Sequence, residues 1–270
     1  MGYSLKSLLF YKENAELFYN KDIITLGTLY PYLSSKEWLK FRKIFECNAT
    51  VENNNFSQYF FCDLLGARSC KALDVSDYQG AEIICNLNQK EHNEEISCDV
   101  IIDVGTLEHL SDPALALMNI FSFLRLDGYF FFGQPCNGWV NHGFYQFSPT
   151  YYQDFTIGNE MYLDLKHIEL QAGSFVLPEK YLRNDICLNS FVSSFRKVTV
   201  FGLISKKGEG ELNFDYMQQK YKIWHNKPSA SVSTRVNFTI WIKHFILSLL
   251  YSNYLHWRLK KVLLRIAGIW

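Results

Sequence analysis

The stretch Cys98-Asp-Val-Ile-Ile-Asp-Val-Gly-Thr-Leu-Glu-His-Leu110, followed by Leu124-Arg-Leu-Asp-Gly-Tyr-Phe-Phe-Phe-Gly-Gln-Pro135, decides the fold. Each stretch holds a short apolar run of the length of a buried strand. The first run ends in a turn that carries Glu108 and His109, and Pro113 then opens an apolar helical segment. A strand, a helix and a second strand in this order predict a parallel β-α-β unit.

The same alternation extends toward the amino terminus. Further buried strands are expected at 22–28, 69–74 and 81–85, with helices at 34–47 and 58–65 between them. This alternation predicts an α/β fold with a doubly wound, mostly parallel sheet that is covered by helices on both faces. Residues 161–170 and 197–204 alternate between apolar and polar side chains. We expect them to form antiparallel strands that close the sheet.

The chain has 270 residues, enough for one large α/β domain and a small appendage. We place the domain at 1–227, with its core at about 22–205. The segment Pro228-Ser-Ala-Ser-Val-Ser-Thr234 has the composition of a linker, and a basic, aromatic, helical tail is expected over 228–270.

The zero net charge hides an asymmetry between the body and the tail. Residues 235–270 hold six Lys or Arg and no Asp or Glu, which leaves 21 basic and 27 acidic residues in the rest of the chain. This argues against a protein that wraps nucleic-acid duplexes. Residues 236–270 carry interfacial Trp and Tyr beside basic residues, which is typical of helices on an anionic membrane surface. Packing of these helices on the domain or on a second subunit is equally open.

The seven cysteines are scattered, and none forms a CxxC pair. Neither a disulfide framework nor a metal site is therefore expected. Cys70, Cys85 and Cys98 fall in apolar runs, where a free thiol acts as a small hydrophobe. No signal peptide is evident at the amino terminus. The expected location is the cytoplasm, either free or at the inner face of the cytoplasmic membrane.

Ligands of open α/β sheets bind outside the carboxyl ends of the strands. The candidate cofactor-binding residues therefore close the expected strands: Gly27, Asp74, Asn86, Leu87, Asn88, Gly105 and Thr106. A carboxylate at Asp74 could accept hydrogen bonds from ribose hydroxyls, or it could cap the turn before Gly80. Asn86 and Asn88 could meet an adenine edge, or they could simply form a turn.

The segment after the last parallel strand combines aromatic rings with hydrogen-bonding side chains. We expect Glu108, Asn137, Phe144, Tyr145 and Gln146 to bind the substrate, because sugars and flat molecules pack on aromatic faces. His142, with His109 in reserve, is the candidate catalytic base for an acceptor hydroxyl. The alternative is a buried aromatic lid that does no chemistry.

Residues 22 to about 155 resemble the class I S-adenosylmethionine-dependent methyltransferases, and most of all the bacterial group associated with surface-polysaccharide and glycan modification. The resemblance rests on four segments: Ser76-Asp-Tyr-Gln-Gly-Ala81, Asn86-Leu-Asn88, Val104-Gly-Thr-Leu-Glu-His109 and His142-Gly-Phe-Tyr-Gln-Phe-Ser-Pro149. It implies a Rossmann-like methyltransferase sheet, S-adenosylmethionine as cofactor, S-adenosylhomocysteine as product, and O-methylation of a sugar or glycan-type acceptor.

One segment departs from the family pattern. The expected first glycine motif is Thr25-Leu-Gly-Thr28, which has a single glycine and no acidic residue. This departure favours an alternative function, a catalytically inactive methyltransferase-like protein that acts as a binding or interaction module. A nucleotide-sugar enzyme on the same sheet is a third possibility. The lack of GxGxxG argues against a nicotinamide-dependent dehydrogenase.

Overall fold

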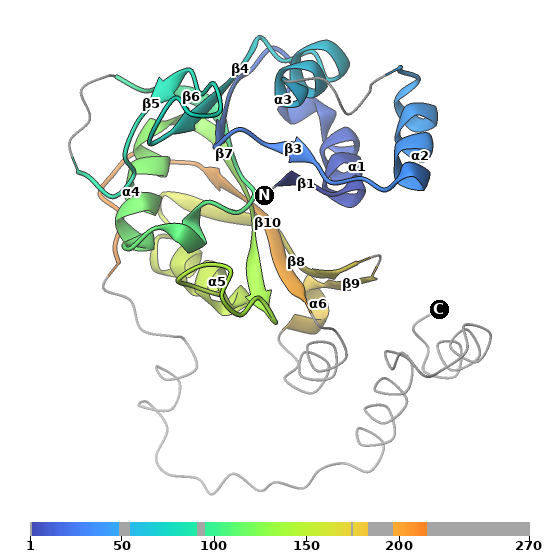
Figure 1. Ribbon diagram of the computed structural model, residues 1–270. Coiled ribbons are helices and arrows are strands. Elements are labelled where there is room, and N and C mark those ends of the chain that lie inside the picture. The colour runs from blue at the N-terminus through green and yellow to red at the C-terminus, as the bar shows by residue number, and fades with distance from the viewer. Residues whose placement is uncertain (1, 49–54, 91–94, 174, 183–196, 215–270) are drawn as a thin grey trace, which may run out of the picture.

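The computed structural model describes residues 2–48, 55–90, 95–173, 175–182 and 197–214 (Figure 1). Its centre is an eight-stranded sheet in the order β5-β4-β2-β6-β7-β10-β8-β9. The strands are β2 (Asp22–Leu26), β4 (Ser69–Asp74), β5 (Ile83–Ile84), β6 (Cys98–Asp103), β7 (Leu124–Asn137), β8 (Leu163–Ala172), β9 (Phe175–Pro178) and β10 (Val198–Lys206). Two short strands, β1 (Gly2–Tyr3) and β3 (Tyr30–Pro31), pair in parallel beside it.

The strand directions confirm the expected fold class. The strands β5, β4, β2, β6 and β7 pair in parallel, while β10 lies antiparallel between β7 and β8. The chain runs outward from β2 to β4 and β5, and then returns to the other side of β2 with β6 and β7. The topological switch point therefore lies between β2 and β6, where open α/β sheets bind their ligands.

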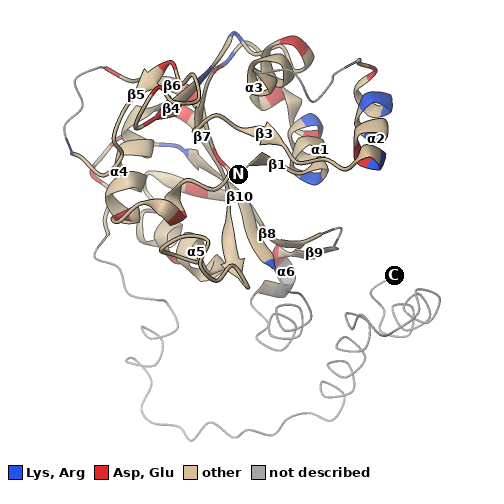
Figure 2. Ribbon diagram, in the orientation of Figure 1, with Lys and Arg blue, Asp and Glu red and all other residues tan. Residues whose placement is uncertain are grey.

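Helices cover both faces of the sheet (Figure 1). One face packs on α1 (Leu5–Glu13), α2 (Ser35–Phe45) and α3 (Phe56–Gln58). Helix α3 continues as a π-helical turn (Tyr59–Leu64). The other face packs on α4 (Pro113–Phe123) and α5 (Pro149–Gly158). Alternate residues of β6 serve the two cores, since Val100 and Ile102 face the first helices and Ile101 faces the second. Figure 2 shows Lys and Arg on α1 and α2, while the central strands are largely uncharged.

Local sequence signals fix several boundaries. Ser34 caps α2 in a reciprocal pair, because its Oγ accepts the Glu37 amide while its own amide donates to Glu37 Oε2 at 2.9 Å. Near the start of β7, the positive φ falls at Asp127 rather than at the neighbouring glycine, where the register against β6 shifts. Gly128 is needed for space instead, since a Cβ there would lie 2.9 Å from the Asp99 carbonyl oxygen.

Some predictions differ in extent from the structure. The edge strand β5 is shorter than predicted, because it pairs with β4 alone over two residues. In contrast, β7 runs on to Asn137, because β10 supplies hydrogen-bonding partners along its whole second half. Cys70, Cys85 and Cys98 are buried free thiols, as expected. The tail expected over 228–270 lies outside the described residues. Within the described part of the chain, no helix is both long and apolar enough to cross a membrane.

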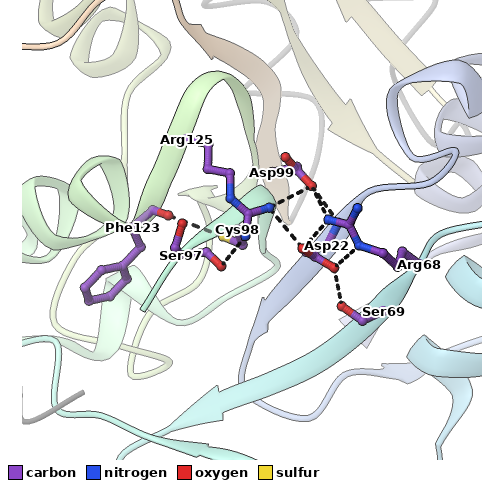
Figure 3. Close-up of polar contacts among 8 residues, drawn as sticks. All are labelled: Asp22, Arg68, Ser69, Ser97, Cys98, Asp99, Phe123 and Arg125. Carbon is purple, nitrogen blue, oxygen red and sulfur yellow. Dashed lines mark hydrogen bonds and ion pairs between the residues drawn. The ribbon is translucent and has the colours of Figure 1, made fainter. Parts of the chain in front are cut away.

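An ion cluster ties together the amino ends of the parallel strands (Figure 3). The Asp22 carboxylate accepts hydrogen bonds from Arg68 and from Arg125, the latter at 2.9 Å, and from the Ser69 hydroxyl at 2.8 Å. Asp99 Oδ2 lies 3.1 Å from the Arg125 guanidinium and accepts the Asp22 amide. The Arg68 hydrogen bond, above all, holds the pKa of Asp22 well below its usual range. The cluster sets the register of β2 against β4 and β6 at the end of the sheet opposite the switch point.

Replacing Asp22 with Asn should lower the free energy of unfolding at pH 7 by about 1 kcal/mol, a modest value because both arginines are about half exposed. The pKa of Asp22 is depressed in the folded state, so its stabilisation is present above the unfolded pKa and is lost as the pH falls below it. Urea unfolding at pH 7 and at pH 3 measures this difference. Asp164→Asn, at the exposed pair with Lys166, is the matched control. Equal losses in the two variants at pH 7 would contradict the account.

Candidate functional site

Three of the expected cofactor-binding residues converge at the switch point. Gly27, directly after β2, has φ +76° and donates its amide to the Leu73 carbonyl at 2.7 Å. A Cβ placed on Gly27 would lie 3.7 Å from Asp74 Oδ2 and 3.9 Å from Thr106 Oγ1. The Thr106 hydroxyl in turn donates to the Leu26 carbonyl at 3.0 Å. The space over Gly27 is thus flanked by a carboxylate and a hydroxyl from the two neighbouring strands; we call Gly27, Asp74 and Thr106 the glycine cradle.

Asp74 is half-buried at the end of β4. Its Oδ1 accepts the amide of Val75 at 2.6 Å, which fixes the carboxyl group at the strand end. Its Oδ2 faces the space over Gly27. One carboxylate oxygen therefore makes a local cap, while the other is directed at the space over Gly27.

A buried carboxylate shapes the turn after β6. Asp103 is completely buried, and it accepts the amides of Thr106 at 2.7 Å and Leu107 at 3.3 Å. Burial raises the pKa of Asp103 to about 6, and the hydrogen bonds from these amides act in the opposite direction. Gly105 lies inside this turn with φ +96°, a conformation that favours glycine. The turn presents Thr106 to the cradle and starts the 3-10 helix η3 (Leu107–His109).

The segment Asn86–Asn88 is held by contacts within the protein. The Leu87 side chain is 3% exposed in the hydrophobic core, and the Leu87 carbonyl accepts the Asn119 amide at 2.9 Å. Asn88 Oδ1 accepts the Ser111 hydroxyl at 3.1 Å, so this side chain ties the strand end to the segment before α4. Asn86 Oδ1 accepts the Asn88 amide at 3.0 Å. This hydrogen bond forms the turn that the sequence left open as the alternative to contact with an adenine.

Glu108 is the second buried acid of the same turn. Its side chain is completely buried, and neither carboxylate oxygen has a hydrogen-bond partner in the structure. The Nε2 atoms of His142 and His109 lie 3.6 and 3.8 Å from Glu108 Oε1. The two imidazole rings meet edge-on, with centroids 5.2 Å apart. The structure therefore brings together both candidate bases and the expected substrate-binding acid; we call Glu108, His109 and His142 the Glu-His-His cluster.

Burial governs the protonation of this cluster. It raises the pKa of Glu108 to about 8, with a further contribution from the neighbouring charge of Asp103. Burial also lowers the pKa of His109, and the nearby His142 imidazole lowers it further. Burial likewise lowers the pKa of His142, with a further contribution from the Lys197 charge.

A cavity of about 630 Å³ opens beside the cluster. Its walls come from the amino-terminal segment, from the ends of β6 and β7, and from β8 and β10: Gly2, Ser4, Ser7, Tyr32, Val104, Gly133, Pro135, Trp139, His142, Gln171, Gly173, Lys197, Thr199 and Phe201. The Lys197 ammonium lies 4.3 Å from the Trp139 ring centroid, and the Trp139 indole donates to the Val198 carbonyl at 3.0 Å. Of the residues expected to act on the acceptor, His142 alone lines this cavity. A smaller cavity of about 320 Å³ lies at the opposite end of the sheet, between α4 and Lys206.

All five expected substrate-binding residues stand outside these walls: Glu108 belongs to the Glu-His-His cluster, and the other four are Asn137, Phe144, Tyr145 and Gln146. Gln146 Oε1 accepts the Trp139 amide at 3.1 Å, and the Tyr145 hydroxyl donates to the Ser111 carbonyl at 2.9 Å, so both hold the loop in place. Asn137 pairs with β10 at the end of β7. Phe144 is 76% exposed. The sequence missed Trp139 and Lys197, since only the insertion of β10 beside β7 brings these residues together.

Comparison with known proteins finds similarity to solved structures and no similarity at the level of sequence families. No family model matches the sequence, and no curated protein matches it significantly. Among solved structures, the YcgJ protein of Bacillus subtilis is 12% identical with a TM-score of 0.45, covering 76% of this chain and 99% of that one. N-methyltransferase NodS from Bradyrhizobium japonicum, in complex with S-adenosylhomocysteine, is 12% identical with a TM-score of 0.42, covering 76% and 86%.

An S-adenosylmethionine-dependent methyltransferase from Mesorhizobium loti is 13% identical with a TM-score of 0.41, covering 74% of this chain and 95% of that one. Similarity at this level does not carry a function from those proteins to this chain. The strand order and directions identify the fold by themselves. It is a Rossmann-like methyltransferase fold.

Replacing Asp103 with Ala should lower the free energy of unfolding by about 1–3 kcal/mol, because the amides of Thr106 and Leu107 lose a buried acceptor. Urea unfolding measures the loss. Asp112→Ala is the control, since the Asp112 carboxylate accepts the Leu115 amide at the exposed start of α4. Hydrogen exchange should also accelerate at 105–107 in the Asp103 variant. Unchanged exchange there would refute the role assigned to this carboxylate.

Proposed function

We propose that this protein is an S-adenosylmethionine-dependent methyltransferase that O-methylates a hydroxyl of a glycan or glycan precursor. The observation that carries this proposal is the glycine cradle at the topological switch point, with the acceptor-sized cavity opening beside the next two strands. The alternative is a catalytically inactive binding module, which the single glycine and missing acid after β2 favour.

The residues of the cradle fit a nucleoside cofactor. Gly27 leaves the space between Asp74 and Thr106 open, and any other residue would place a Cβ there. Asp74 Oδ2 faces that space and can accept hydrogen bonds from a ribose hydroxyl pair. When bound, S-adenosylmethionine supplies an electrophilic methyl group on a sulfonium sulfur. The chain's part is to hold this group and an acceptor hydroxyl in one line, where alignment provides most of the acceleration.

The cavity supports a sugar-like acceptor. Its volume lies within the usual range for small-molecule sites. Its walls hold the aromatic rings of Tyr32, Trp139 and Phe201. They also hold hydrogen-bonding side chains, among them Gln171, Thr199 and the Lys197 ammonium. Aromatic faces beside hydrogen-bonding groups suit a polyhydroxylated ligand.

The acceptor hydroxyl must lose its proton as it attacks. In the proposed function this happens at the Glu-His-His cluster, because His142 both lines the cavity and lies 3.6 Å from the Glu108 carboxylate. His109, whose Nε2 lies 3.8 Å from the same carboxylate oxygen, is the second proton acceptor. The Glu108 carboxyl group, when ionised, stabilises positive charge that develops on either ring.

Calorimetric titration with S-adenosylhomocysteine tests the cofactor. The wild-type protein should bind with a Kd on the order of micromolar, and Asp74→Ala should lose most of that affinity, since the ribose hydroxyls lose their acceptor. Asp77→Ala, in the exposed turn that follows, is the control that should bind normally. No binding by a folded wild-type protein would instead support the inactive module.

Gly27→Ala and Gly80→Ala form a second, matched pair. Both glycines have nearly the same φ, +76° and +77°, so both variants should lose roughly 1–2 kcal/mol of stability from backbone strain. At Gly80 an added Cβ meets nothing within 4 Å, whereas at Gly27 it enters the cradle. Only Gly27→Ala should therefore weaken binding of S-adenosylhomocysteine. Equal affinity in the two variants would rule out the cradle as the cofactor site.

A further inference from the structure

The Glu108 carboxylate is the one buried acid in the described part of the chain for which both oxygens lack a hydrogen-bond partner. A buried charge without a partner is costly, so such a group is normally paired, protonated or bound to a cation. Asp103 lies close enough to Glu108 for the two negative charges to repel each other, which increases this cost. A positive charge at this position would relieve both effects.

The two imidazoles are placed as ligands would be. Their Nε2 atoms lie 3.6 and 3.8 Å from Glu108 Oε1, beyond hydrogen-bonding distance. Two ligand atoms that share a tetrahedral cation, each about 2.1 Å from it, are separated by about 3.4 Å. One ligand atom from each of the three side chains lies within 4.8 Å of the others.

The backbone holds this arrangement from both sides. The Glu108 carbonyl accepts the amides of Phe144 at 2.7 Å and Tyr145 at 3.2 Å, which fixes the loop carrying His142 against the turn carrying His109. Between them, Gly143 packs so closely that a Cβ would lie 2.8 Å from Glu108 Cγ. The three side chains are therefore held together by main-chain contacts rather than by a chance meeting of surface groups.

From this geometry we propose that Glu108, His109 and His142 bind a divalent first-row transition-metal cation. Two imidazoles and one carboxylate favour Zn²⁺, Mn²⁺ or Fe²⁺ over Mg²⁺ and Ca²⁺, which prefer oxygen ligands. Three protein ligands leave at least one coordination position open, as in catalytic rather than structural sites. The sequence pattern gave no expectation of a metal, because His142 is remote from the Glu108-His109 pair along the chain.

The cation would act on the acceptor, a role that rests on the proposed function. His142 lines the 630 Å³ cavity, so the open coordination position is reached from there. A hydroxyl that ligates a divalent cation becomes more acidic. Its O–H bond breaks, the proton passes to water in the cavity, and the oxygen keeps the electron pair with which it attacks the methyl carbon. With a cation bound, His142 serves as a ligand that positions the acceptor, and this role replaces the proton-accepting role given to it in the absence of a metal.

Titration of the full-length, chelator-treated protein with Co²⁺ tests the site, because Co²⁺ reports nitrogen and oxygen ligation through its visible absorption. The wild-type protein should bind one Co²⁺ per chain, and Zn²⁺ should displace it while excess Mg²⁺ should not. His109→Ala and His142→Ala should each weaken binding on the order of tenfold or more. His167→Ala is the matched control, since His167 lies 3.3 Å from the Glu169 carboxylate outside the cluster. It should bind Co²⁺ normally.

Absence of saturable Co²⁺ binding in the wild-type protein would overturn the proposal, and so would normal binding by both His109→Ala and His142→Ala. The His109 side chain is 46% exposed, so we expect His109→Ala to fold. The test therefore does not depend on replacing the buried Glu108, for which a variant such as Glu108→Gln could fail to fold. Titration with S-adenosylhomocysteine separates this inference from the proposed function. Cofactor binding without Co²⁺ binding refutes the metal site alone. Co²⁺ binding without cofactor binding refutes the methyltransferase and leaves the metal site standing.

Discussion

The buried Asp103 carboxylate, clamped on the amides of Thr106 and Leu107, is the constraint on which both halves of the site depend. It folds the chain back sharply after β6, with Gly105 supplying the positive φ that this reversal requires. One side of the turn presents Thr106 to the glycine cradle. The other side carries Glu108 and His109 toward the cavity. A looser turn would separate the glycine cradle from the Glu-His-His cluster.

The two sides are built by different means. The cradle follows from parallel strand topology, since Gly27, Asp74 and Thr106 close three adjacent strands and meet without any long-range loop. The Glu-His-His cluster depends instead on a tertiary contact, the docking of the loop at 142–145 on the Glu108 carbonyl. The Glu108 carboxylate, which has no hydrogen-bond partner in the structure, is the anchor of the proposed cation site.

Much of the fold and half of the site could be predicted from sequence. The strand at 69–74 matches its prediction residue for residue, because Gly66 and the turn after Asp74 bound a clear apolar run. Gly27 and Asp74 follow from the rule that ligands bind at strand ends. The burial of Leu87 could not be predicted, because periodicity after a short edge strand does not reveal that the next side chain turns into the core. The alternation at 197–204 predicted an antiparallel strand, but it did not predict that this strand lies between β7 and β8. Trp139 and Lys197 became visible only with that position of β10.

Hydrogen exchange with and without S-adenosylhomocysteine tests most directly the claim that the cradle is a cofactor site at the switch point. Exchange should slow at 26–28, 74–76 and 104–109, where the three strand ends meet. It should remain unchanged at 118–122 and 206–212, around the smaller cavity at the opposite end of the sheet. Protection around that smaller cavity, with none at the strand ends, in a sample saturated with ligand would contradict the account.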